Sequence, residues 1–173
     1  MRYASETQKI RMLLKEKLFN GYGADIGFGR DKIVPHAIAI DLPVPTAKCE
    51  GDDPVNLGGD ARRLDWFKDN ALDFIYSSHL LEDFSEEENL NVLKEWSRVL
   101  KVGGNLILVL PHEEEYRSHC KRSGYRSNPN HKIVSMSPSY MADKIGLVGG
   151  LDIVETSGIV NSYSFYIVAR KVK

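Results

Sequence analysis

Short apolar runs alternate with helical stretches along this chain, and that alternation constrains the fold more than any other feature of the sequence. Most of the apolar runs are continuous, which is typical of strands covered on both faces in a parallel sheet. They lie between turn-forming clusters, at residues 23–28, 37–41, 54–57, 72–78 and 105–110. The sequence therefore predicts an α/β fold built on a Rossmann-like, mostly parallel sheet.

Helices are predicted before and between these strands. Residues 5–20 carry leucine and isoleucine at helical spacing and are followed by Gly21, a residue type that commonly ends helices. Ser85 and Glu88 form a capping-box pattern at the start of a second helix. Its apolar face continues to a stop at residues 103–104, which makes it the best-defined helix of the sequence.

The last third of the chain begins with a polar stretch, residues 112–137, that shows neither strand nor helix periodicity. Loops of this length are uncommon in compact domains unless they serve a function, so we predict that the stretch covers the site as a lid. A shorter helix is predicted at 138–147. Two strands at 153–159 and 163–172 follow it and are expected to pair antiparallel at the end of the sheet.

Length and composition restrict the class of protein. A chain of 173 residues, with 42% apolar and 27% charged residues, fits one soluble globular domain, 1–173. Its 23 Lys and Arg balance 24 Asp and Glu, so no global positive field would recruit nucleic acid or a membrane. No apolar run reaches a membrane-spanning length, and the isolated Cys49 and Cys120 form no disulfide framework. We expect a cytoplasmic protein, either monomeric or oligomeric.

Four features fall at the carboxyl ends of the predicted strands, where open α/β sheets bind ligands. Gly27 and Gly29 follow the first strand and would let a ligand approach the backbone closely. Asp41 ends the second strand, where a carboxylate can accept the hydroxyls of a ribose. Gly59-Asp60-Ala61 follows the third strand and offers a carboxylate and an amide to adenine, and the fourth strand runs into Ser77-Ser78-His79. Taken singly, the glycines could form a simple turn, and Asp41 could cap one.

As a set, this order of motifs resembles class I S-adenosylmethionine-dependent methyltransferases of the type 11 kind, over residues 23–111. The resemblance implies that S-adenosylmethionine is the cofactor and that 23–111 is the cofactor-binding half, between an N-terminal helix (1–22) and a C-terminal helix and strand pair (138–173). It also implies a set of cofactor-binding residues: Asp25, Gly27, Phe28 and Gly29 around the methionine part, Asp41 at the ribose, Leu42 on the adenine face, Asp60 and Ala61 at the adenine edge, and Ser78 near the methionine end.

The sequence departs from the family pattern after the first two strands. Asp31 stands where many members have a third glycine, and only residues 30–36 precede the second strand, so the helix expected there is reduced or missing. Residues 42–54 similarly replace the next helix. A dinucleotide-binding enzyme is a weaker alternative, because its fingerprint needs a glycine at Lys32 and an acid about 20 residues later, whereas Asp41 comes too soon.

Histidine is the residue type best suited to accept a proton from a hydroxyl acceptor near neutral pH. His112, just after the fifth strand, is our first catalytic candidate, followed by His131 and by His79 after the fourth strand. Each could instead be a solvated loop or helix-end residue. The segments around His112 and His131 loosely resemble methyltransferases of surface-glycan pathways, which implies a sugar acceptor and O-methylation by in-line transfer.

Other functions fit parts of the sequence. A zinc site around His112, His119 and Cys120 lacks regular ligand spacing, so no metal is predicted. The basic residues of 112–137 could grip a phosphorylated acceptor, although a solvated loop explains them as well. The reduced first helix also suits a non-catalytic module that binds S-adenosylmethionine or a partner.

Nucleic-acid methylation is disfavoured by the neutral net charge and by Ser77-Ser78-His79-Leu80, which replaces an Asn-Pro-Pro-Tyr-like segment. The sequence therefore predicts a methyltransferase for a small-molecule or glycan acceptor, with no nucleic-acid or membrane partner.

Overall fold

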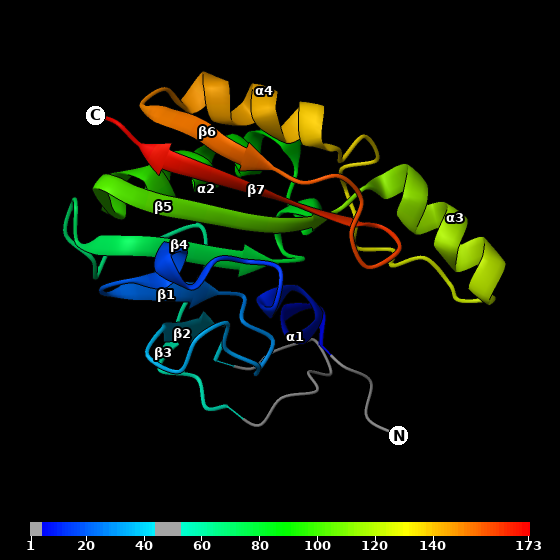
Figure 1. Ribbon diagram of the computed structural model, residues 1–173, viewed down its shortest axis with the longest axis horizontal. Helices are drawn as coiled ribbons and strands as arrows, with labels where there is room; N and C mark the ends of the chain where they lie inside the picture. The colour runs from blue at the N-terminus through cyan, green and yellow to red at the C-terminus, as the bar shows by residue number, and fades with distance from the viewer. Residues whose placement is uncertain (1–4, 44–52) are drawn as a thin grey trace.

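A seven-stranded sheet runs through the part of the chain that the computed structural model describes, residues 5–43 and 53–173 (Figure 1). The strand order is β3-β2-β1-β4-β5-β7-β6. The strands are β1 (Gly23–Ile26), β2 (Ile38–Asp41), β3 (Leu57–Gly58), β4 (Leu72–Ser78), β5 (Leu100–Pro111), β6 (Leu151–Thr156) and β7 (Ser164–Lys171). The predicted Rossmann-like sheet is confirmed.

Parallel pairing joins β3, β2, β1, β4 and β5, whereas β7 lies antiparallel between β5 and β6. In the register, Ile26 of β1 lies opposite both Ile40 of β2 and Ser77 of β4. Asp41 lies opposite Gly58 of β3. The carboxyl ends of four neighbouring strands therefore meet at one edge of the sheet, as the sequence predicts, and this edge holds the site.

Two helices, α2 (Glu86–Val99) and α4 (Pro138–Val148), cover one face of the sheet. The capping box predicted for α2 is present, because Ser85 accepts from the Glu88 amide while the Glu88 side chain accepts from the Ser85 amide. The helix ends before the predicted stop at residues 103–104. Leu100 already belongs to β5 and lies opposite Leu72, so sheet pairing ends α2 at Val99.

The opposite face is covered by the N-terminal segment, and here the predicted helix 5–20 is wrong. The structure has a one-and-a-half-turn helix α1 (Glu6–Arg11) and a separate 3-10 turn η1 (Glu16–Phe19). Leu18 and Phe19 are both buried, and the Phe19 ring packs edge-on against Phe74 of β4 at 5.5 Å between centroids. Packing against the sheet outweighs helix propensity in so short a segment.

The polar stretch 112–137 also differs from the prediction, because its first half is a helix, α3 (Glu113–Ser123). Three glutamates occupy the first turn, Lys121 and Arg122 the last, and Gly124 ends the helix in the left-handed conformation at φ 70°. This charge order complements the helix dipole. In Figure 1 the helix extends away from the sheet, and its buried residues are Glu113 and Cys120. The helix therefore lacks the continuous apolar stripe by which a helix is predicted from sequence.

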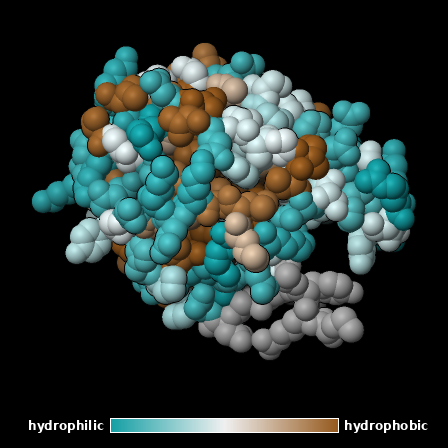
Figure 2. Space-filling model, viewed as in Figure 1, coloured by the Kyte–Doolittle hydropathy of each residue, from teal (hydrophilic) through white to brown (hydrophobic). Residues whose placement is uncertain are grey.

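The helix expected after β1 is absent from residues 27–37, which form turns only. Arg11 of α1 fills this region, because its guanidinium donates to Asp31 and to the carbonyls of Lys32 and Ile33. Most of the predicted helix replacement at 42–54 lies outside the described residues. The face seen in Figure 2 is mixed, with hydrophobic patches between hydrophilic side chains. No helix within the described ranges is long and apolar enough to cross a membrane.

Candidate functional site

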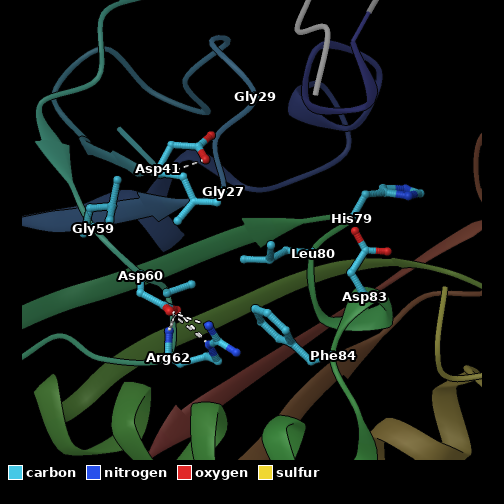
Figure 3. A pocket seen from close by; sticks show the side chains of 13 residues that line it. Gly27, Gly29, Asp41, Gly59, Asp60, Arg62, His79, Leu80, Asp83 and Phe84 are labelled. Carbon is cyan, nitrogen blue, oxygen red and sulfur yellow. Dashed lines mark hydrogen bonds and ion pairs between the residues drawn. The ribbon is translucent and has the colours of Figure 1, made fainter. Parts of the chain in front are cut away.

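A cavity of about 270 Å³ opens at the carboxyl ends of the parallel strands (Figure 3). Its wall combines the loop after β1, the end of β2, the loop after β3 and the turn after β4. Six of the nine cofactor-binding residues predicted from sequence lie on this wall: Gly27, Gly29, Asp41, Leu42, Asp60 and Ala61.

The glycine loop follows β1 directly and has a backbone that side chains would disturb. Gly27 has a φ of 67° and Gly29 a φ of 58°, both in the left-handed region that favours glycine. A Cβ on Gly27 would lie 2.9 Å from a methyl group of Leu80. The Gly27 amide also donates to the Ile40 carbonyl at 2.8 Å, which ties the loop to β2. The loop is therefore held open beside the cavity.

Three predicted cofactor residues lie away from the cavity wall. Asp25 has no exposed surface, and its Oδ2 accepts from the Ile33 amide at 2.7 Å. Burial raises the pKa of Asp25 to about 8. Phe28 is buried, and the Ser78 hydroxyl is buried without a hydrogen-bond partner among the described residues. Asp25 thus fixes the segment that follows the glycine loop through the amide of Ile33.

Asp41 and Leu42 form the wall next to β2. One carboxylate oxygen of Asp41 accepts from the Leu42 amide at 2.7 Å, which fixes the turn at the end of the strand. Both side chains line the cavity, and Leu42 is 44% exposed. An acid beside a half-exposed apolar side chain suits a ligand that carries hydroxyls and a flat ring.

Asp60 is held by a residue that sequence analysis did not single out, Arg62. The guanidinium donates to Asp60 Oδ2 at 2.6 Å and to Oδ1 at 3.0 Å, and these bonds lower the pKa of Asp60. Arg62 also contacts Glu88 of α2 at 2.8 Å and lies over the Phe84 ring. Figure 3 shows Arg62 and Asp60 facing each other at the cavity. An amine group of a bound ligand would therefore compete with Arg62 for hydrogen bonds to the Asp60 carboxylate.

His79 lines the cavity directly after β4 and has a φ of 51°, an unusual backbone conformation for a non-glycine residue. Its Nδ1 lies 3.3 Å from Glu82 Oε1, and its Nε2 lies 3.1 Å from the Ser164 hydroxyl. Burial alone would lower the pKa of His79. The hydrogen bond to Glu82 and the charges of Glu82 and Glu6 outweigh that effect, so the pKa lies above its ordinary value.

The two histidines ranked higher from sequence lie elsewhere. His112 precedes α3, its amide donates to the Tyr163 carbonyl at 2.7 Å, and it does not line the cavity. His131 is 5% exposed, and its Nδ1 lies 2.9 Å from Glu113 Oε2. Of the three histidines considered from sequence, His79 in the turn after β4 is the one that lines the cavity.

The zinc alternative has no geometric support in the described ranges, which contain no group of three or more His, Cys, Asp or Glu side chains placed to hold a metal ion. Cys120 is a buried free thiol on the inner side of α3.

Comparisons with known proteins agree with this geometry. Residues 25–108 match a family model described as a methyltransferase domain. A search of curated proteins finds no significant match. The matched segment begins at Asp25 in β1 and ends in β5, so it contains every strand end that forms the cavity.

Solved structures share the fold across almost the whole chain. A methyltransferase from Archaeoglobus fulgidus, described as SAM dependent, has a TM-score of 0.70 at 18% identity, covering 95% of this chain and 92% of its own. A Thermotoga maritima methyltransferase, described as a possible histamine N-methyltransferase, has a TM-score of 0.66 at 23% identity, covering 96% and 88%. A Haloferax volcanii putative methyltransferase in complex with the Trm112 activator has a TM-score of 0.62 at 16% identity, covering 88% and 83%.

The strand order and the cavity at the strand ends define a class I methyltransferase fold. With the family match over residues 25–108, this part of the chain is a methyltransferase domain, and solved S-adenosylmethionine-dependent methyltransferases share its fold. Its cofactor is S-adenosylmethionine.

Proposed function

We propose that this enzyme methylates a hydroxyl group of a small-molecule or glycan acceptor, with His79 as the general base. The observation that supports the proposal most strongly is the position of His79 on the cavity wall, with Glu82 at its Nδ1. Hydroxyl acceptors need a base in reach because they must lose a proton as the new bond forms.

The described residues fit S-adenosylmethionine, which when bound supplies an activated methyl group on a sulfonium. We infer that Asp41 binds the ribose hydroxyls, Leu42 covers the adenine, and Asp60 with Ala61 contacts the adenine edge. Gly27 and Gly29 give the methionine part close access to the backbone. The carboxylate of Asp83 on the same wall has a buried Oδ1 without a hydrogen-bond partner in the described ranges, which suits a polar ligand at this end.

His79 would act in its neutral form. An Nδ1–H directed at Glu82 leaves the lone pair of Nε2 free to accept the acceptor's proton. In the structure that lone pair faces the Ser164 hydroxyl at 3.1 Å, so the acceptor hydroxyl replaces Ser164 as the partner of Nε2. Catalytic hydrogen bonds commonly form only in the complex with substrate.

Charge around His79 favours a neutral acceptor over a phosphorylated one. Carboxylates of Glu6 and Glu82 approach the imidazole, and Asp83 lines the same end of the cavity. Phosphate would be repelled there. The basic residues of the predicted lid are exposed, and none of them lines the cavity.

Amine N-methylation is a second candidate, because the same carboxylates would attract a cationic amine. Burial and the neighbouring charge of Glu82 raise the pKa of Asp83. A cation bound there would stabilise the ionised form of the Asp83 carboxyl. The Thermotoga maritima neighbour, described as a possible histamine N-methyltransferase, makes amines a natural part of an acceptor panel.

The test is a turnover assay that measures S-adenosylhomocysteine release with sugars, other hydroxyl compounds and amines. With the acceptor found, we expect His79→Gln to lower kcat by about 10²- to 10⁴-fold, the range of general-base catalysis. The KM for S-adenosylmethionine should stay within a few-fold, because the base does not bind the cofactor.

His112→Gln is the comparison variant, and we expect it to lose less activity than His79→Gln. A larger loss in His112→Gln would overturn the assignment of the base. Tight cofactor binding with no turnover on any acceptor would favour the non-catalytic module instead.

A further inference from the structure

A chain of four buried or half-buried side chains leads from the cavity to α3. His79 Nδ1 lies 3.3 Å from Glu82 Oε1, and the same oxygen lies 3.9 Å from His131 Nε2. On its other side, His131 Nδ1 lies 2.9 Å from Glu113 Oε2. The side chains of Glu82, His131 and Glu113 are all at most 5% exposed. Glu82 is therefore shared by two imidazoles.

The backbone of Glu82 joins the same two regions. Its carbonyl accepts from the Lys132 amide at 2.8 Å and from the Ile133 amide at 3.3 Å. Glu82 lies in the 3-10 turn η2 (Leu81–Asp83), directly after β4 and His79. One residue thus attaches the segment 131–133 to the site through its main chain and contacts His131 and His79 through its side chain.

Other polar groups face His79 from every element around it. Glu6 Oε2 lies 4.0 Å from Nε2, with Lys9 on the same helix. The Tyr163 ring contacts the imidazole edge-on at 6.0 Å, and the Ser164 hydroxyl faces Nε2. Among the described residues, Glu82 alone approaches Nδ1, so Glu82 decides which nitrogen carries the proton.

We propose that Glu82 is a positioning residue for methyl transfer: it fixes the His79 tautomer with the proton on Nδ1 and couples His79 to His131 and, through His131, to Glu113 of α3. The inference rests on the proposed function, in which His79 is the base. Burying a carboxylate in this way, with its Oε2 lacking a hydrogen-bond partner among the described residues, costs free energy, and a functional role for Glu82 accounts for that cost.

The experiment uses the full chain with Glu82→Gln, which preserves side-chain size. An amide can either accept a hydrogen bond from Nδ1–H through its oxygen or donate one to Nδ1 through its NH2 group, so it no longer selects one tautomer. By ¹⁵N NMR of the imidazoles, without any acceptor, we expect wild-type His79 in the Nδ1–H form and mixed tautomers in Glu82→Gln. The titration midpoint of His79 should also move to lower pH, because a negative charge is removed.

In the turnover assay, Glu82→Gln should lower the plateau of kcat by about 10- to 100-fold, as loss of a supporting carboxylate commonly does. The acidic limb of the pH profile should move to lower pH, and the KM for S-adenosylmethionine should be unchanged. Glu82→Asp retains the charge and should restore part of both effects. Asp152→Asn, an exposed change on β6, is the control that keeps the wild-type profile.

A Glu82→Gln protein whose His79 tautomer, midpoint and pH profile match wild type would overturn the proposal, even if its stability falls. If Glu82→Gln does not fold, Glu113→Gln tests the chain from its other end, with the exposed neighbour Glu114→Gln as its matched control. Glu113→Gln must then change the His131 imidazole spectrum and, through Glu82, that of His79. Because the NMR measurement needs no acceptor, the tautomer and titration midpoint of His79 can be determined even if the proposed function fails.

Discussion

Asp25 shows how a single buried acid can make the stability of this protein depend on pH. It lies in β1, just before the glycine loop, with no exposed surface, and its Oδ1 has no hydrogen-bond partner in the part of the chain described. Burial raises its pKa from 3.8 to about 8. The folded protein therefore keeps this proton up to about pH 8, whereas the unfolded chain releases it near pH 4.

We predict that stability falls as pH rises through this window, because the unfolded state binds fewer protons there. One such group changes the free energy of unfolding by at most ~1.4 kcal/mol per pH unit. This corresponds to roughly 3–5 °C in Tm per pH unit for a domain of this size. Thermal unfolding of cofactor-free Asp25→Asn between pH 5 and 8 should show a flatter dependence than wild type. Equal slopes in the two proteins would contradict the assignment, and Asp152→Asn should keep the wild-type slope.

At the scale of elements, α2 holds the loop that carries Asp60. The indole Nε1 of Trp96 donates to the Ala61 carbonyl at 2.8 Å, and Glu95 accepts from the Leu64 amide at 2.9 Å. Trp96 itself is fully buried in the core under the sheet. The helix therefore links core packing directly to the loop that carries Asp60 on the cavity wall.

We predict that Trp96→Phe destabilises the protein by about 1–3 kcal/mol, because it leaves the Ala61 carbonyl unpaired and removes packed volume. The loop at Ala61 should also loosen, so the Kd for S-adenosylmethionine should rise several-fold. Denaturant unfolding and calorimetric titration measure the two effects. Tyr22→Phe, at a 77% exposed position, should change neither. A Trp96→Phe protein with lower stability but an unchanged Kd for S-adenosylmethionine would contradict the predicted effect of α2 on cofactor binding.

On the scale of the whole molecule, cofactor binding should stabilise the fold, because the cavity wall joins loops from four strands. We expect micromolar binding of S-adenosylmethionine, about −8 kcal/mol. At 100 times the Kd, linkage then stabilises the protein by about 2.7 kcal/mol. Asp41→Ala and Asp60→Ala should lose most of the rise in Tm, whereas Asp152→Asn should keep it. No binding by folded wild-type protein would contradict the cofactor site proposed here.

Local signals in the sequence determined most of the sheet, α2 and α4, whereas the third strand, predicted at 54–57, is Leu57–Gly58. Continuous apolar runs marked β4 to the residue, the Ser85–Glu88 box marked the start of α2, and the helix at 138–147 proved one residue longer. The positions of Asp41 and Asp60 beside one cavity could be predicted because parallel strands place their carboxyl ends at one edge of the sheet. These strands, helices and acids depend on residues that are close in sequence, or on a general rule of parallel sheets. They can therefore be predicted from the sequence alone.

Only the tertiary structure decided which histidine meets the cavity and how Asp60 is held. His79 contacts Ser164, 85 positions away, and Arg62, which holds Asp60, also contacts Glu88, 26 positions from Arg62. The early end of α1 and the isolated α3 likewise follow from packing and charge rather than from apolar periodicity. Contacts between distant segments arise when the chain closes around its core, and no local pattern in the sequence records them.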